Sequence, residues 1–169
     1  MHWRTALRAS DAAAVLSLVH DTGFFSAAEE QVAVELVEET LTRGRDSGYE
    51  FLFADMPDQP GQLQGYTCYG LIPATESSFD LYWIAVSPAC QGRGLGAELM
   101  RESERLAYAA GARQMYADTS GREQYTPTRA FYERMGYTKA AVLKDFFAPG
   151  DDKVIYARRL GPAVEFLQK

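Results

Sequence analysis

A glycine-rich loop is the segment whose residue types and spacing most directly predict chemistry. It spans Gln91–Gly96, reads QGRGLG, and stands between a predicted strand and a predicted helix. The first turn of a helix has unpaired backbone N–H groups and partial positive charge, and glycines let a phosphate approach that backbone closely. Each such contact contributes about 0.3–1 kcal/mol. With Arg93, the loop therefore predicts a pyrophosphate site; the alternative is a turn that caps the helix without a ligand.

Two common phosphate motifs and one covalent mechanism do not fit this loop. A P-loop needs Gly-Lys-Ser/Thr, a tripeptide that the sequence lacks. The glycine spacing is not that of dinucleotide folds, whose motif also belongs near the start of a parallel sheet. Cys90 adjoins the loop and raises the question of an acyl-enzyme. Both histidines, His2 and His20, lie near the N-terminus, so we interpret Cys90 as an ordinary cysteine.

The elements around the loop predict one mixed α/β domain over residues 1–169, with a cofactor-binding core at about 79–137. Alternation of apolar residues predicts strands that first meander and then alternate with helices. Capping-box spacing between Ser26 and Glu29 predicts a helix start. We expect strands at 3–7, 50–54, 63–71, 79–86, 113–119, 137–147 and 154–160, and helices from about 10, 27–43, 94–110 and 126–135.

Composition excludes several classes of protein. The 169 residues carry a formal charge of -6 and a pI of about 5.0, which argues against nonspecific nucleic-acid binding and mildly favours amine-bearing partners. Two cysteines cannot form a disulfide scaffold, and no ligand spacing indicates a metal site. The N-terminus does not resemble a signal peptide, and no apolar run predicts a membrane span, so we expect a cytoplasmic protein. A homodimer stays open, because exposed sheet edges often pair.

Two segments carry a resemblance to a known family. Asp80–Pro88 (DLYWIAVSP), followed by Gln91–Gly96, resembles the acetyl-CoA signature of the GNAT superfamily of N-acetyltransferases. Ala130–Tyr137 (AFYERMGY) resembles the family's later Phe-Tyr-x-x-x-Gly-Phe/Tyr segment. The resemblance implies a mostly antiparallel central sheet of six to seven strands flanked by about four helices. It also implies acetyl transfer from acetyl-CoA, without a metal, to a primary amine of a small molecule or peptide.

Two other functions stay open on the same resemblance. One is a transferase that uses a longer acyl-CoA. The other is a noncatalytic acyl-CoA-binding or protein-interaction module.

The resemblance also implies cofactor contacts. The strand backbone before the loop would pair with the pantetheine arm, and the loop amides would bind the pyrophosphate. Tyr125 stands where many family members carry an asparagine that contacts the cofactor, so that contact is in question. The implied cofactor-binding residues are Ile84, Ala85, Val86, Gln91, Gly92, Arg93, Gly94, Leu95, Gly96, Ala97 and Tyr125.

Two residues receive catalytic roles from the resemblance. Tyr132 matches the tyrosine proposed to protonate the departing CoA thiolate, and Asp80 matches the position of a glutamate base in histone-type members. Asp80 is one methylene shorter, which suggests action through a water; Glu50 and Asp118 are weaker candidates for the base. A backbone N–H near Val86 would stabilise the developing oxyanion.

Acceptor specificity is expected from aromatic residues, because loop variation and not the fold sets the substrate. The candidates are Phe24 and Phe25, between the first two helices, together with Tyr82 and Trp83 on the strand. Each of these aromatic side chains has the alternative role of packing in the core.

Overall fold

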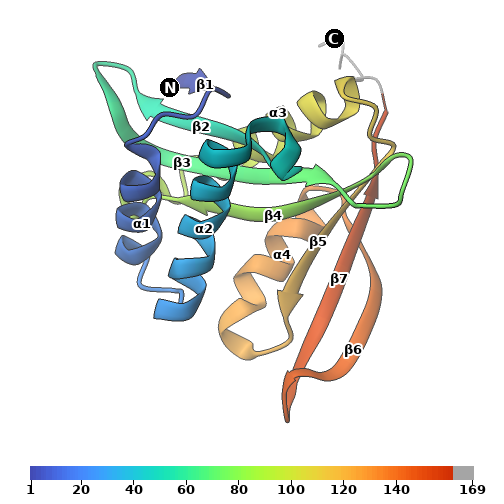
Figure 1. Ribbon diagram of the computed structural model, residues 1–169. Helices are drawn as coiled ribbons and strands as arrows, with labels where there is room; N and C mark the ends of the chain where they lie inside the picture. The colour runs from blue at the N-terminus through green and yellow to red at the C-terminus, as the bar shows by residue number, and fades with distance from the viewer. Residues whose placement is uncertain (162–169) are drawn as a thin grey trace, which may run out of the picture. The chain divides into compact units, whose positions relative to one another are not determined.

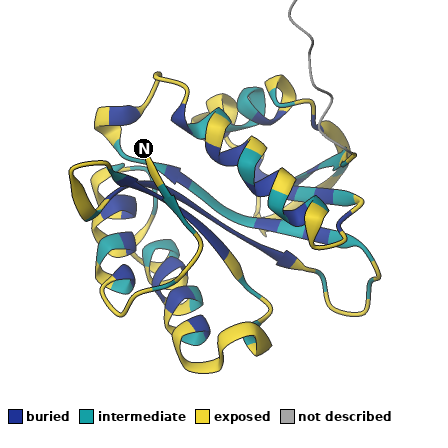
Figure 2. Cartoon of the chain, turned by 90° about the horizontal axis from the view of Figure 1, so that it is seen from above, coloured by how far each residue is buried: buried dark blue, intermediate teal, exposed yellow. Residues whose placement is uncertain are grey.

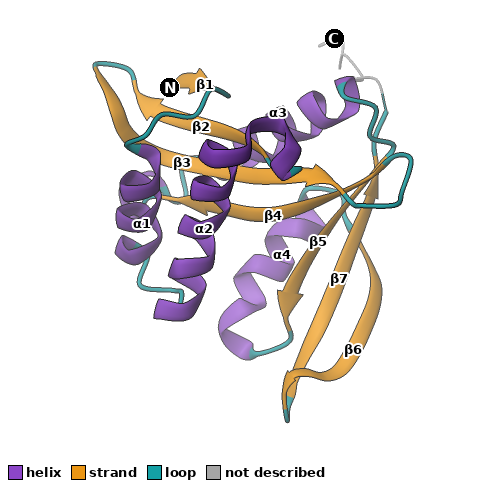
Figure 3. Ribbon diagram, in the orientation of Figure 1, coloured by secondary structure: helices purple, strands orange, loops and turns teal. Residues whose placement is uncertain are grey.

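The computed structural model describes residues 1–161, which form a seven-stranded sheet with four α-helices (Figures 1 and 3). The strand order is β1-β2-β3-β4-β5-β7-β6. The expected α/β fold with a mostly antiparallel sheet is confirmed. The strands are β1 (His2–Arg4), β2 (Glu50–Met56), β3 (Gln59–Leu71), β4 (Ser78–Val86), β5 (Gln114–Ser120), β6 (Thr138–Ala148) and β7 (Asp151–Arg159). The helices are α1 (Asp11–Asp21), α2 (Ala27–Arg43), α3 (Leu95–Ala109) and α4 (Thr126–Arg134).

Most predicted boundaries agree with the structure to within two residues, and three do not. β7 begins at Asp151, three residues before the expected start at 154. The first strand ends at Arg4, earlier than the expected residue 7. β3 begins at Gln59, four residues before the expected start, because the turn between β2 and β3 contains only Pro57 and Asp58. A two-residue turn of this kind joins antiparallel strands directly.

The described chain packs as two compact units. The first comprises Met1–Gly70 and Trp83–Ser103, and the second comprises Leu71–Tyr82 and the described residues from Glu104 onward. The assignment of residues 1–169 to one domain stays a prediction, as does the core at about 79–137.

In the first unit, α1 and α2 each bury one face, as the alternation of dark and yellow turns in Figure 2 shows. Val15 and Val19 of α1 and Val37 of α2 are fully buried. The predicted capping box is confirmed: the backbone N–H of Glu29 donates to Ser26 Oγ at 3.3 Å, and that of Ser26 donates to Glu29 Oε2 at 2.8 Å. This reciprocal pair satisfies two otherwise unpaired donors and sets the start of α2.

The antiparallel pairing of β2 with β3 contains a β-bulge. Ala54 pairs with Gly65 and Asp55 pairs with Leu63, so Gln64 is an extra residue on β3. Bulges of this kind re-aim side chains and often adjoin active sites. Beside the bulge, a Cβ on Gly65 would lie 2.8 Å from Leu99 Cδ1 of α3. The helix therefore lies directly against β3 at a position that requires glycine.

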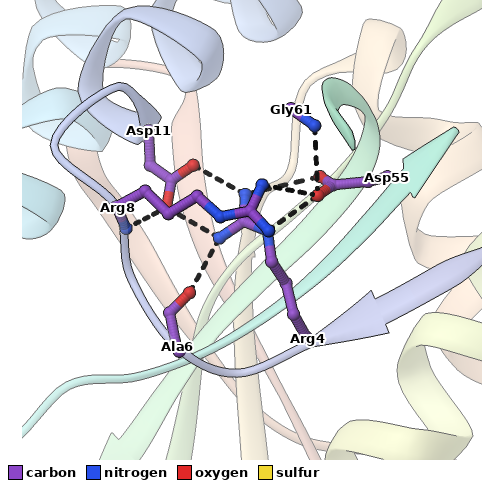
Figure 4. A network of polar contacts seen from close by, with 6 residues as sticks. All are labelled: Arg4, Ala6, Arg8, Asp11, Asp55 and Gly61. Atoms are coloured by element: carbon purple, nitrogen blue, oxygen red, sulfur yellow. Dashed lines mark hydrogen bonds and ion pairs between the residues drawn. The ribbon is translucent and has the colours of Figure 1, made fainter. Parts of the chain in front are cut away.

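A buried ionic network fixes the N-terminal segment to β2 (Figure 4). Arg4 Nε lies 2.8 Å from Asp55 Oδ2, and Arg4 Nη2 lies 2.6 Å from Asp11 Oδ1. The Gly61 N–H and Arg8 also contact Asp55 Oδ2, at 3.3 and 3.4 Å. Burial alone would raise the pKa of Asp55, but the hydrogen bonds and positive charge of Arg4 dominate and lower it.

In the second unit, β4 and β5 are parallel, whereas β5–β7 and β6–β7 are antiparallel. The parallel ladder runs from Ser78↔Gln114 to Leu81↔Ala117 and ends there, although β4 continues to Val86. Helix α4 contributes the buried Tyr132, which packs with Tyr156 of β7. The unit thus presents one catalytic candidate from α4 and another, Asp80, from β4.

Candidate active site

The glycine-rich loop has the conformation that its sequence requires. Gly92 and Gly94 have φ values of 72° and 89°, in the left-handed region that favours glycine. A Cβ on either residue would meet no atom within 4 Å. Gln91–Gly94 are exposed, and the buried Leu95 begins α3. The backbone, not side-chain packing, therefore selects glycine here, and the surface above the loop is open.

The start of α3 presents a row of unpaired donors. The N–H of Glu98 donates to the carbonyl of Gly94 at 3.1 Å and closes the first turn. Within residues 1–161, no acceptor contacts the backbone N–H groups of Gly92, Gly94, Leu95, Gly96 and Ala97. Such a cluster, with the positive end of a helix dipole behind it, is suited to a diphosphate.

Arg93 differs from its neighbours in the loop. Its backbone N–H donates to the carbonyl of Cys90, although the distance of 3.4 Å makes this a long bond. In the described part of the chain its guanidinium is exposed and makes no hydrogen bond or ion pair. The side chain is therefore available to an anion at the loop.

The strand before the loop carries the other predicted cofactor residues. Ala85 is buried, whereas Ile84 and Val86 are half-buried, and all three lie beyond the end of the β4–β5 ladder. The side-chain amide of Gln91 donates to the carbonyl of Val86 at 3.3 Å. Gln91 thus links the first residue of the loop to the last residue of β4.

Cys90 has the environment of a structural cysteine. It is buried, it is not in a disulfide, and its thiol donates to Gln64 Oε1 at 3.2 Å. This contact agrees with the interpretation of Cys90 as an ordinary cysteine. Gln64 itself was missed by the sequence analysis, since a bulge on a distant strand leaves no pattern near the loop.

Tyr132 lies on α4 within a group of rings. Its ring centroid is 5.6 Å from that of Tyr156, 5.8 Å from that of Phe131 and 5.9 Å from that of Tyr137. Its side chain is buried, and its hydroxyl has no hydrogen-bond partner in the region that the structure describes. Burial first, and then the negative charge of Asp118, raise the pKa of Tyr132. The phenol therefore stays protonated and can act as a proton donor.

Asp80 lies beside a second carboxylate. It pairs with Tyr116 across the parallel ladder, so Asp118, two residues further along β5, is on the same face of the sheet. Asp80 is half-buried and, within residues 1–161, has no hydrogen-bond or ion-pair partner. Burial first, and then Asp118, raise the pKa of Asp80, while Lys153 lowers it. A carboxyl with a raised pKa is better matched to accept a proton near neutral pH.

Lys153 of β7 completes this cluster and was also missed from the sequence. Its Nζ lies 2.5 Å from Asp118 Oδ2 and 4.8 Å from the centroid of the Phe146 ring. Asp118 is therefore in an ion pair, whereas Asp80 is not. Of the candidate bases in this unit, Asp80 is the one that is free to take a proton. Glu50 lies in the other unit and is exposed at the start of β2.

The remaining candidates occupy mixed environments. Tyr125 is buried and precedes α4, with the Arg122 guanidinium 5.6 Å from its ring centroid. Phe25 packs against Trp83 with ring centroids 4.8 Å apart, and Phe24 packs edge-on against Phe25 at 5.3 Å. Tyr82 is half-buried.

Two kinds of feature are absent from residues 1–161. No group of three or more His, Cys, Asp or Glu side chains is arranged to hold a metal ion. No helix there has both the length and the apolar character needed to cross a membrane.

The strand, glycine loop and helix, on a seven-stranded mixed sheet, define the fold of an acyl-CoA-dependent acyltransferase. The sequence model of the acetyltransferase (GNAT) family matches residues 17–137. The chain belongs to this family and is a GNAT acetyltransferase.

Solved structures agree with this family assignment. A Desulfovibrio desulfuricans protein assigned to the GNAT family is 46% identical, with a TM-score of 0.91 over 95% of this chain and 99% of that one. The aminoglycoside 6'-N-acetyltransferase of Enterococcus faecium (16% identity, TM-score 0.74, 96% and 98% covered) shares the fold. So does the Escherichia coli ribosomal-protein-S18-alanine N-acetyltransferase (18%, 0.72, 99% and 99%). A search of curated protein sequences finds no match.

Proposed function

We propose that this GNAT acetyltransferase transfers the acetyl group of acetyl-CoA to a primary amine of a small molecule or peptide. Attack by the amine is direct, in a ternary complex with both substrates. The observation that carries the proposal is the row of unpaired N–H groups at Gly94–Ala97, behind an exposed loop with two left-handed glycines. The accessible backbone donors supply what a diphosphate needs.

The cofactor contacts follow from this loop. The amides of Gly94–Ala97 bind the pyrophosphate, and the unpaired guanidinium of Arg93 adds a positive charge. The backbone of Ile84–Val86 pairs with the pantetheine arm. Gln91 supports this arrangement because it already binds the carbonyl of Val86. The role of Tyr125 is the least supported of these assignments, because its side chain is buried and its ring lies near Arg122.

Acetyl transfer proceeds by addition of the amine to the thioester, followed by elimination of the CoA thiolate. The amine nitrogen bonds to the thioester carbonyl carbon, the C–S bond breaks, and the amine loses a proton. Asp80 accepts this proton directly or through a water, and Tyr132 donates one to the departing thiolate. Deprotonating a lysine-like amine at neutral pH costs about 4–5 kcal/mol, whereas an α-amine costs about 1 kcal/mol. Only the first type of acceptor depends strongly on Asp80.

Acceptor recognition is assigned to Phe24, Phe25 and Tyr82. The packing of the Phe24, Phe25 and Trp83 rings against one another supports a role as an aromatic wall, and packing in the core is the competing role.

Calorimetry with coenzyme A and acetyl-CoA tests the cofactor site, and thiol release across a panel of amines tests the reaction. We expect binding of both and turnover with at least one primary amine. Absence of affinity for coenzyme A would remove the proposal. Binding without turnover on any amine would favour a noncatalytic module. Faster turnover with longer acyl-CoAs would indicate that one of these, and not acetyl-CoA, is the acyl donor.

A further inference from the structure

We infer that Gln64, the extra residue of the β3 bulge, is a positioning residue for the pyrophosphate loop. It holds the turn that leads from β4 into the loop, and so sets where the amides before α3 point. This inference rests on the proposed cofactor site.

The bulge releases Gln64 from the β2 ladder and directs its polar groups to the turn. The backbone carbonyl of Gln64 accepts the N–H of Ser87 at 2.8 Å. Its side-chain Oε1 accepts the Ser87 hydroxyl and the Cys90 thiol, each at 3.2 Å. One residue of β3 therefore contacts both ends of the turn 87–90.

Backbone hydrogen bonds connect the turn 87–90 to the loop. The N–H groups of Cys90 and Gln91 donate to the carbonyl of Ser87 at 2.9 and 3.2 Å, and the N–H of Arg93 donates to the carbonyl of Cys90. In each of these bonds the acceptor is a residue that Gln64 contacts, Ser87 or Cys90. The Gln91–Gly94 segment is exposed and has few other restraints. Loss of the Gln64 contacts would therefore act first on the loop.

The Gln64 side chain is buried, so loss of its hydrogen bonds is not readily compensated by water. It is 6% exposed, so replacing it with an apolar group leaves the Ser87 hydroxyl and the Cys90 thiol without their acceptor. Unsatisfied donors favour a change in the turn that brings them to water. Such a change displaces the loop amides without touching the residues assigned to acid–base chemistry.

The test compares Gln64→Leu with Gln64→Glu, and with Gln62→Leu as a matched control on the same strand, since Gln62 is exposed. For Gln64→Leu we expect the Kd of coenzyme A to rise about tenfold, equivalent to about 1.4 kcal/mol. The kcat at saturating acetyl-CoA should change by less than about threefold, as expected when binding and not chemistry is affected. Gln64→Glu retains an acceptor for both donors and should restore most of the affinity.

Backbone hydrogen exchange gives a second measurement that a general loss of stability would not reproduce. In Gln64→Leu, exchange should accelerate in residues 87–94 and stay unchanged in α1 and α2. If this variant does not fold, the double variant Ser87→Ala/Cys90→Ala removes the same side-chain contacts from the other side and should show the same local exchange.

The two proposals fail differently. A wild-type protein without affinity for coenzyme A contradicts the proposed function. If the wild type binds coenzyme A, and the folded Gln64→Leu variant binds it equally well with unchanged hydrogen exchange in residues 87–94, this inference is overturned and the proposed function is not.

Discussion

Gly65→Ala should destabilise the protein because α3 and β4 leave no room for a side chain at this position. The added Cβ would lie 2.8 Å from Leu99 Cδ1 and 3.0 Å from the carbonyl oxygen of Ala85. Carbon atoms pack best at about 3.5–4.0 Å, so α3 or Leu99 must move by roughly 0.7–1.2 Å. Leu99 is fully buried and cannot rotate into solvent, and the Ala85 oxygen belongs to the backbone. Overpacking of this kind costs about 1–3 kcal/mol.

Thermal unfolding measures the effect. For a chain of this length each kcal/mol lowers Tm by about 2–4 °C, so we expect a fall of about 2–12 °C. Gly161→Ala is the control, since a Cβ there meets no atom within 4 Å and its φ is not left-handed. Combination with Leu99→Val, which removes the atom at 2.8 Å, should cost less than the sum of the two single changes. A Gly65→Ala variant with the Tm of the wild type would refute the close contact between α3 and β3.

Three further outcomes are expected. Tyr132→Phe should lower kcat by a factor of about 10²–10⁴ while the Kd of coenzyme A stays unchanged. An unchanged kcat would show that Tyr132 is not the general acid. In the proposed role of Asp80 as a base, kcat/KM should fall as the pH falls through its raised pKa. Lys153→Met should move this fall in kcat/KM to higher pH and Asp118→Asn should move it to lower pH, and movement in one direction for both would contradict the proposed role. Asp55→Asn should cost about 3–5 kcal/mol by breaking a buried pair. The pKa of Asp55 is lowered in the folded protein, so this stabilisation is present above the ordinary pKa of aspartate and is lost as the pH falls through the folded pKa. The free energy of unfolding, measured as a function of pH, should show this loss in the wild type and not in the variant.

The features of the fold that sequence analysis predicted are those encoded over short distances. The start of α2 follows from Ser26 and Glu29 alone, and the loop from its glycines. The helical period of Val32, Leu36, Val37 and Leu41 predicts the buried face of α2. Val37 is fully buried, but Val32 is 46% exposed and Ala33 is buried in its place. Several small apolar residues on this helix allow more than one face to pack, and tertiary contacts decide between them.

The features that sequence analysis missed depend on contacts between distant segments. Gln64 contacts the turn 87–90 only because it is the extra residue of the bulge on β3, and Lys153 reaches Asp118 only through the register of β7 on β5. A single shift in either register would move the side chain to the other face of the sheet. No local pattern in the sequence encodes these registers.

This difference explains why the donor of the acetyl group is easier to infer than the acceptor. A diphosphate is bound by backbone N–H groups, whose positions depend on glycine φ values and on a helix start, and both leave a pattern in the sequence. An amine acceptor is recognised by side chains, whose contacts depend on tertiary structure and leave no comparable local pattern. Relatives with different acceptors can therefore keep one cofactor loop. The Asp80 carboxylate has no hydrogen-bond or ion-pair partner among residues 1–161 and lies half-buried beside the Asp118–Lys153 pair. This environment favours an acceptor that needs help to lose its proton.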